Sequence, residues 1–344
     1  MTDTTQTDGN AADGEATADG ESTADEVVTA AELAAHLRCP RQYEFEHERP
    51  LSPSETSGER LADRRRELLG ESIVAGLCLD AASPDERVAA ACDRLAELRD
   101  AARSSSLVAE QVRYDREVVE TAIEEYFTGS GQDHAERLVA ADETLSYERD
   151  GVRYETTVDA VVERDSGYLA LDYRPTMNGV LNVSWYDDNV RRFEEGEGFY
   201  PRQIGSLVRA AVAIRSLTDE YGLTPNYDFA YVALLEDSRP AYDAAGEIHV
   251  DVTQRHFQSA YEQEKADVNA LVASRAAALR DGETDPREWQ FDAITDRSCS
   301  YCAYQHACPD YLESELSFTD RPRNSSDEST DEPPASGHPS EENP

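Results

Sequence analysis

Two aspartates stand where paired strands would bring their carboxylates together. Residues 154–163 and 168–174 both read as strands, and the four residues between them form a turn, which is the pattern of a β-hairpin. With that turn, residue 162 pairs with 169, 160 with 171 and 158 with 173, and these pairs form one apolar face. Asp159 then lies opposite Asp172 on the other face, with β-carbons about 4.5–5.5 Å apart.

Opposed carboxylates repel each other unless a positive charge lies between them. A divalent cation would remove the repulsion, and oxygen ligands suit Mg²⁺ or Mn²⁺. The alternative is that both side chains point into solvent, in a chain where 72 residues are Asp or Glu. A shift of one residue in the strand register would also separate the pair.

Four cysteines form a second candidate site. Cys299, Cys302 and Cys308 lie on one short segment. Cys39 is the only other cysteine that lies next to residues typical of a loop. Four thiolates can hold either zinc or an iron–sulfur cluster, and the spacing leaves both open. Such a site would join the two ends of the domain, and we find no other feature of the sequence that ties them.

The other two cysteines, Cys78 and Cys92, lie inside helical patterns. Buried free cysteines commonly pack as small hydrophobic side chains. We therefore expect these two to be buried and to take no part in the four-cysteine site.

The composition is strongly acidic. The 344 residues include 72 acids and 32 bases, for a net charge of -40, and Lys265 is the one lysine. Such a composition is typical of proteins from halophilic archaea. In molar salt the Debye length is about 3 Å, so only local charge matters and the net charge does not exclude nucleic acid. With no secretory signal and no apolar run of about 18 residues, we expect a cytoplasmic protein without membrane contact.

The pattern of elements predicts one mixed α/β domain at residues 27–314 between disordered acidic tails, 1–26 and 315–344. A capping box, Thr29 to Glu32, opens a helix that runs to Arg38. Further helices are expected at about 59–79, 84–103, 106–127, 197–221 and 254–280, and strands at 136–148, 151–163, 168–173 and 226–235.

These features together resemble the PD-(D/E)XK nuclease superfamily over about residues 29–312. In particular the chain is similar to the RecB-like iron–sulfur exonucleases, including those associated with CRISPR adaptation. The residues that carry the resemblance are Cys39-Pro40-Arg41 with the following Tyr43 and Phe45, Asp159, Asp172-Tyr173-Arg174, Gln203, and Cys299, Cys302 and Cys308 followed by Pro309.

The resemblance implies a restriction-endonuclease-like mixed sheet flanked by helices. It also implies a [4Fe-4S] cluster on Cys39, Cys299, Cys302 and Cys308 that clamps the N- and C-terminal segments together. Asp159, Asp172 and the main-chain carbonyl of Tyr173 would hold Mg²⁺ or Mn²⁺. Such an ion polarises the scissile phosphate and activates water. Gln203 would position DNA.

Three positions depart from the family pattern. Arg174 stands where the family has lysine, and it offers positive charge to a phosphate but cannot abstract a proton. The helix residue Gly70 is followed four residues later by Val74 instead of a metal-binding His. The nearest acid, Glu71, would point about 60° away from that position. Leu207 stands where a Tyr usually follows the Gln.

The expected function is therefore a metal-dependent DNA nuclease that acts on ends or single strands. Its expected partners are DNA and the proteins of repair or CRISPR adaptation. The alternative is a catalytically inactive RecB-like module that binds DNA or a partner, and a third reading is a zinc-clamped structural protein. Residues 64–66, Arg191, Arg192, Arg202 and Arg209 could contact DNA, or could pair with nearby acids in solvent.

Overall fold

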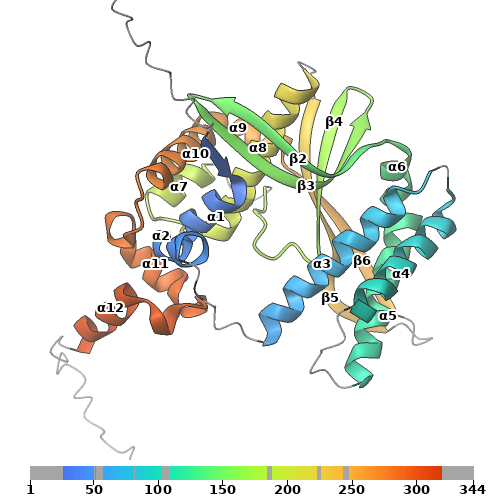
Figure 1. Cartoon of the computed structure of the whole chain (residues 1–344), viewed down its shortest axis with the longest axis horizontal. Helices are drawn as coiled ribbons and strands as arrows, with labels where there is room; N and C mark the ends of the chain where they lie inside the picture. The colour runs from blue at the N-terminus through green and yellow to red at the C-terminus, as the bar shows by residue number, and fades with distance from the viewer. Residues whose placement is uncertain are drawn as a thin grey trace, which may run out of the picture.

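The computed structural model describes residues 26–49, 51, 57–80, 82–101, 109–183, 188–222, 226–242 and 248–319. In this part of the chain a six-stranded mixed sheet lies between helices (Figure 1). The predicted mixed α/β class is confirmed. The two predicted tails fall mostly outside the described residues, although Glu26 begins a strand and the last helix, α12 (Pro309–Thr319), continues past Glu315.

The predicted hairpin forms the centre of the sheet. Its register is confirmed for two of the predicted pairs, Ala160 with Leu171 and Val162 with Leu169. The predicted pair of Val158 with Tyr173 is wrong, because the pairing ends at Ala160 and these two side chains lie in different cores. The strands follow the order β1-β3-β4-β5-β6, and β2 also pairs with β3. Their bounds are β1 (Glu26–Thr29), β2 (Leu138–Arg149), β3 (Val152–Arg164), β4 (Gly167–Arg174), β5 (Asn226–Tyr242) and β6 (Ile248–His256). The pairs β1·β3 and β4·β5 are parallel, and the other three are antiparallel.

The long strand β3 has an interrupted edge. On one side it pairs with β1 at residues 152–155 and with β4 at residues 160–164. No described strand pairs with residues 156–159 on that side. Val158 packs in one core cluster and Ala160 in the other, although residues two apart in a regular strand face the same way. The strand therefore turns over at Asp159, and its backbone is open to side chains there.

One face of the sheet packs against α1 (Ala30–Arg38), α7 (Asn189–Glu194), α8 (Pro201–Tyr221), α9 (Gln258–Gln263) and α10 (Lys265–Arg280) (Figure 1). The predicted capping box of α1 is confirmed, since the Thr29 N–H donates to Glu32 at 2.8 Å and the Glu32 N–H to Thr29 at 3.1 Å. A Cβ at Gly205 of α8 would lie 3.1 Å from the Cβ of Ala34. Glycine therefore lets α8 approach α1 closely.

The opposite face packs against α3 (Ser57–Leu77), α4 (Pro84–Ala101), α5 (Ala109–Thr128) and α6 (Ser130–Glu136), as the right side of Figure 1 shows. Leu169, Leu171 and Tyr173 of β4 point into this core. Asp172, between them, must therefore face α1 and α8. No described helix is long and apolar enough to cross a membrane.

The helix predicted at 254–280 is wrong at its start, because β6 runs to His256 and α9 begins only at Gln258. Asp228 causes this change of structure. Its Oδ1 accepts from the N–H of Phe257 at 3.3 Å and from the N–H of Gln258 at 3.0 Å, so it satisfies the first free donors of the helix.

The C-terminal segment returns to the start of the chain. It contains α11 (Phe291–Arg297), short 3₁₀ turns at Cys299–Tyr301 and Gln305–Ala307, and α12. These elements lie beside α2 (Pro40–Tyr43) and the π-helical turn Glu44–Glu48 that follows it (Figure 1). The two ends of the described chain are therefore adjacent.

A buried arginine holds α3 and α4 together. Arg87 of α4 is 2% exposed. Its Nε–H donates to the side-chain oxygen of Gln132 at 3.2 Å. Its guanidinium donates to three carbonyls at the end of α3, those of Gly76 at 2.9 Å, Leu77 at 3.2 Å and Leu79 at 2.6 Å.

We predict that Arg87→Met lowers the free energy of unfolding by about 3 kcal/mol or more, because buried carbonyls lose their donor. Chemical denaturation measures this loss. The control is Arg94→Met on the same helix, whose ion pair with Glu71 at 2.5 Å is 40% and 41% exposed. That change should cost much less stability, because water already screens this pair. Equal losses in the two variants would contradict the buried role of Arg87.

Candidate functional site

Asp172 is buried on the sheet face that α8 covers. Its carboxylate is 0% exposed. Three guanidinium groups surround it, and each comes from a different element: Arg209 of α8 at 2.8 Å, Arg174 of β4 at 3.1 Å and Arg66 of α3 at 3.3 Å. A charge that is shielded from water needs opposite charges nearby. Here three positive groups surround the Asp172 carboxylate.

These arginines set the protonation state of Asp172. Burial alone would raise its pKa, but the charges of Arg209, Arg174 and Arg66 outweigh burial and lower the pKa below the ordinary value. Asp172 is therefore ionised near neutral pH and above. The guanidinium of Arg174 also lies 4.0 Å from the ring centre of Tyr231, which limits its movement.

Asp159 lies next to Asp172 in a different environment. Its Oδ2 accepts from the main-chain N–H of Tyr173 at 2.6 Å. Burial, and then the charge of Asp172, raise the pKa of Asp159 to about 6. The two carboxylates are thus brought together as the hairpin register predicted, and each carries one role: Asp172 holds the negative charge, and Asp159 takes up a proton first.

The Tyr173 side chain is anchored on the other face of the sheet. Its hydroxyl lies 2.6 Å from the hydroxyl of Tyr126, which lies 2.9 Å from Nδ1 of His134. Tyr126 and Tyr173 are almost fully buried. This chain of hydrogen bonds fixes the strand position from which the Tyr173 N–H holds Asp159.

Helix α3 brings Gly70 to the carboxylate pair. A Cβ at Gly70 would lie 3.8 Å from Oδ1 of Asp159. Glu71, the nearest acid to the missing His, instead pairs with Arg94 of α4 at 2.5 Å. Leu207, in place of the family Tyr, is 0% exposed in the core.

A cavity of about 550 Å³, which we name the arginine cavity, is lined by the three arginines that pair with Asp172, but neither Asp159 nor Asp172 is among its lining residues. Five arginines line it, and Glu46 is the one acid among its lining residues. The five are Arg38, Arg66, Arg174, Arg202 and Arg209. In a chain of net charge -40, this local excess of positive charge favours an anionic ligand.

The arginines of the cavity affect one another. The pKa of Arg38 is lowered, first by burial and then by the charge of Arg202, while Glu46 opposes the shift. The Nε–H groups of Arg38 and Arg209 are buried and find no acceptor in the described part of the chain. Unpaired donors and crowded cations both favour the approach of an anion.

Gln203 lies on α8 beside Arg202, but it does not line the arginine cavity. The lining residues of α8 are Pro201, Arg202, Gly205, Ser206 and Arg209, which share one helix face at spacings of three and four residues. Arg202 therefore occupies the place at the cavity that we expected Gln203 to have. Arg38 was not predicted, and its position directly before Cys39 was the one signal in the sequence.

Of the two basic clusters in the sequence, Arg66 lines the cavity, while Arg65 and Arg191 lie outside it. Arg65 pairs with Asp115 of α5 at 2.5 Å, and Arg191 pairs with Asp188 and Glu195 of its own helix region, both at 2.9 Å. These arginines fit the alternative in which surface cations pair with nearby acids.

The four cysteines of the predicted site line one small cavity of about 20 Å³. Burial, then the charges of Cys299 and Cys302, raise the pKa of the Cys39 thiol to about 12. Burial, then Cys302 and Cys308, raise the pKa of Cys299 to about 12. Because thiolates here repel one another in a dry place, a bound cation would stabilise them.

Within the described residues, no three His, Cys, Asp or Glu side chains lie as a group that could hold a metal ion. Metal binding would thus require the thiols to move closer. Other contacts also join the chain ends, which corrects our expectation of no further tie. Arg41 bonds Asp310 at 2.7 Å, and the rings of Phe45 and Tyr304 lie 5.5 Å apart.

The prediction that Cys78 is buried is wrong. Cys78 is exposed, because α3 ends one residue earlier at Leu77. Cys92 is partly buried and packs against the core formed with α3, α4 and α5.

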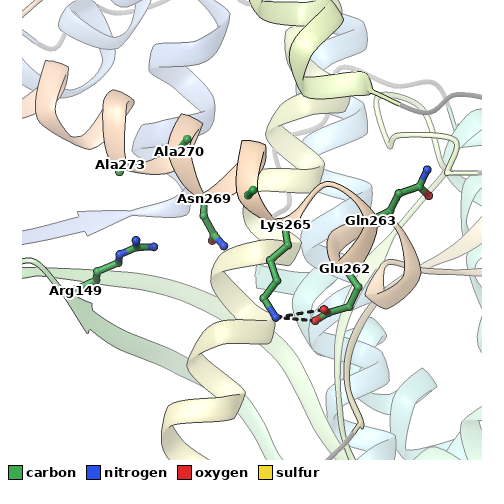
Figure 2. A pocket seen from close by; sticks show the side chains of 8 residues that line it. Arg149, Glu262, Gln263, Lys265, Asn269, Ala270 and Ala273 are labelled. Carbon is green, nitrogen blue, oxygen red and sulfur yellow. Dashed lines mark hydrogen bonds and ion pairs between the residues drawn. The ribbon is translucent and has the colours of Figure 1, made fainter.

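A second hollow of about 630 Å³ lies between the end of β2 and α10 (Figure 2). It contains Lys265, whose ammonium pairs with Glu262 at 3.0 Å. Its remaining walls are mainly alanines and amides, with Arg149 facing them across the hollow. It offers no cluster of reactive groups, so the arginine cavity is the candidate site.

No family model and no curated protein matches this chain. Among solved structures, it is similar to a crystal structure from Eubacterium rectale described as a "Putative exonuclease". The identity is 12% and the TM-score 0.44, over 76% of this chain and 84% of that chain. A TM-score below 0.5 does not establish a shared fold.

The raised pKa of Asp159 predicts a pH-dependent stability. In the unfolded chain the carboxyl titrates near 3.8, and in the folded chain near 6. Between these values only the folded state keeps the proton, so this group's contribution to stability falls as pH rises to about 6 and stays low above. Asp159→Asn removes the partly buried charge and keeps an acceptor for the Tyr173 N–H.

We therefore predict that, without divalent cations, Asp159→Asn is more stable than wild type at pH 8 by on the order of 1–3 kcal/mol. The difference should vanish near pH 4. Denaturation of both proteins across this pH range measures it, and effects of other acids cancel in the comparison. A variant less stable than wild type at pH 8 would contradict the burial of a charged Asp159.

Proposed function

We propose that this protein is a metal-dependent nuclease that holds a DNA strand by its phosphates. The observation that carries the proposal is the arginine cavity. Five arginines line it, and three of them pair with the buried Asp172: Arg66, Arg174 and Arg209. Arginine binds phosphate through paired N–H groups. The phosphate backbone supplies most of the affinity of nucleic-acid-binding proteins.

Local charge explains how so acidic a chain binds a polyanion. The acids are spread along the whole sequence, while the cavity gathers five arginines with Glu46. Salt screens distant charges far more than contacts inside a cavity. A strand placed here meets positive charge first.

The carboxylate oxygens of the pair are the type of ligand that a divalent cation prefers. Asp159 and Asp172 would hold it, and the repulsion that raises the pKa of Asp159 would be relieved. Bound Mg²⁺ or Mn²⁺ supplies Lewis-acid activation of a phosphate and of water. Arg66 and Arg174 now bond the oxygens of Asp172, so they would turn to the phosphate as the carboxylate took up the ion.

The arginines of the cavity would have different roles in binding and in hydrolysis. Arg202 and Arg38 would hold strand phosphates, and Arg174 would neutralise the charge that develops on the phosphate under attack. Arg174 cannot serve as a base, since arginine stays protonated. The proton of the attacking water would therefore leave to solvent or to another phosphate oxygen.

The second candidate function is a binding module without hydrolysis. One observation favours it: three guanidinium groups already neutralise Asp172, and cations so close would weaken the binding of a metal ion. In this case the cavity would bind DNA, and the carboxylates would serve to place the arginines.

We further propose that Cys39, Cys299, Cys302 and Cys308 hold a [4Fe-4S] cluster. Four sulfur donors from both chain ends line one cavity. Zinc remains the alternative ion for the same four donors. The role would be structural, since this site completes a wall of the arginine cavity.

We predict opposite effects on binding and cleavage for Asp172→Asn. Loss of the carboxylate leaves the arginines with more net charge, so the affinity for labelled single-stranded DNA should rise. Cleavage in Mn²⁺ and molar KCl should be lost, because the cation loses a ligand. Titration without metal measures binding, and gel assays on single-stranded and duplex DNA measure cleavage.

Arg202→Ala changes a residue of the cavity wall that does not contact Asp172. It should weaken DNA binding and lower the slope of log affinity against log salt by about 0.7. The matched control is Arg191→Ala, outside the cavity, which should change neither quantity. Cleavage that survives Asp172→Asn would refute the catalytic site. Binding without any turnover by wild type would establish the second candidate, and absence of binding would refute both.

If the four cysteines hold a [4Fe-4S] cluster, we predict that the purified protein is coloured. Protein purified without oxygen should be brown, with the broad absorbance of thiolate-bound clusters. Ser in place of any one of the four cysteines should bleach it and lower the thermal midpoint, while the ties of Arg41 and Phe45 keep the chain ends adjacent. Cys78→Ser is the control and should stay brown. A colourless protein with one zinc per chain would replace the cluster by zinc.

A further inference from the structure

The arginine cavity contains one aromatic ring that is free to meet a ligand. Three tyrosines line the cavity. Tyr231 is 0% exposed beneath Arg174, and Tyr304 is 6% exposed against Phe45. Tyr301, in contrast, is 75% exposed.

The exposure of Tyr301 is unusual for so large a side chain. Among the described residues, its ring makes none of the aromatic or cation–π contacts that the other tyrosines of the cavity make. Its main chain is nevertheless fixed, because the Tyr301 N–H donates to Ser298 at 3.2 Å and the Cys302 N–H to Cys299 at 3.1 Å. A rigid turn thus holds an apolar ring at the rim of a cavity lined by cations.

We propose that Tyr301 is the residue on which a nucleic-acid base stacks, so that the cavity reads a single strand by phosphate and base together. This inference rests on the proposed binding of DNA and adds a contact that does not involve phosphate. Stacking of bases on exposed aromatic rings is a general mode of single-strand binding.

The size of the cavity supports a single strand. A volume of about 550 Å³ is that of a site for one small ligand. A duplex would not enter it, and the bases of a duplex already stack on one another. A strand end whose bases are unstacked can place a phosphate on the arginines and a base face on Tyr301.

The position of Tyr301 also relates binding to the cysteines. Tyr301 lies between Cys299 and Cys302 in the sequence, on the 3₁₀ turn that begins at Cys299. Any change that loosens the cysteine segment would therefore displace the ring. The cysteine site and the stacking ring belong to one small structural unit.

The test compares a short single-stranded oligonucleotide with an abasic oligonucleotide of equal length, bound to the metal-free full chain. Tyr301→Ala should weaken binding of the normal strand about tenfold, and Tyr301→Phe should bind within about twofold of wild type, because it keeps the ring. On the abasic strand, wild type and Tyr301→Ala should bind equally. A 2-aminopurine base in the strand should be quenched by wild type and not by Tyr301→Ala.

Tyr200→Ala is the matched control. Tyr200 is 52% exposed beside the cavity residue Arg202, but its ring lies 5.7 Å from Arg297 and does not line the cavity. This change should leave binding unaltered. Thermal unfolding of each variant checks that the fold is intact, which the exposure of both rings leads us to expect.

Two results would overturn the stacking role in distinguishable ways. If wild type binds normal and abasic strands equally while Arg202→Ala weakens both, the phosphate site stands and the stacking role fails. If wild type binds neither strand, the proposed function fails and the stacking role fails with it.

Discussion

The buried charge of Asp172 is the constraint on which the site depends. A carboxylate with no exposure to water must be neutralised by its neighbours. It draws guanidinium groups from α3, β4 and α8, so the helices on both faces of the sheet are held at one point. Even when Asp159 beside it is also ionised, the three guanidinium groups carry more charge than the two carboxylates. The surplus of positive charge is open to the arginine cavity, where an anionic ligand can complete the compensation.

The interrupted edge of β3 provides the room for this arrangement. If residues 156–159 were paired with another strand, their backbone groups would be satisfied within the sheet. Instead, the Thr157 carbonyl accepts from Arg209 at 2.6 Å, and Asp159 accepts from the Tyr173 N–H. The same gap that breaks the sheet thus anchors one arginine and holds the second carboxylate. The hydrogen bonds of the Thr157 carbonyl and of Asp159 thus replace part of the strand pairing that is lost there.

The sequence alone predicted the carboxylate pair, because strand alternation and a short turn determine which residues are opposite. The capping box and most helices followed from equally local signals. The arginines around Asp172 could not be assigned, since Arg66 and Arg209 come from helices whose rotation depends on packing. For the same reason Gln203 was expected where Arg202 lines the cavity. The strands β1 and β6 were missed: β1 has four residues and pairs with a distant strand, and the alternation of residues 248–256 was not recognised before a helix.

The arginine cavity depends on both ends of the described chain. Arg38 ends α1, and the next residue, Cys39, begins the cysteine cavity. Gln42 and Tyr304, from opposite ends of the sequence, line both cavities. Separation of the ends would therefore remove a wall of the arginine cavity and would separate Cys39 from the other three cysteines. Because Arg41–Asp310 and Phe45–Tyr304 already join these ends, a metal at the cysteines would chiefly fix the positions of the residues that line the arginine cavity.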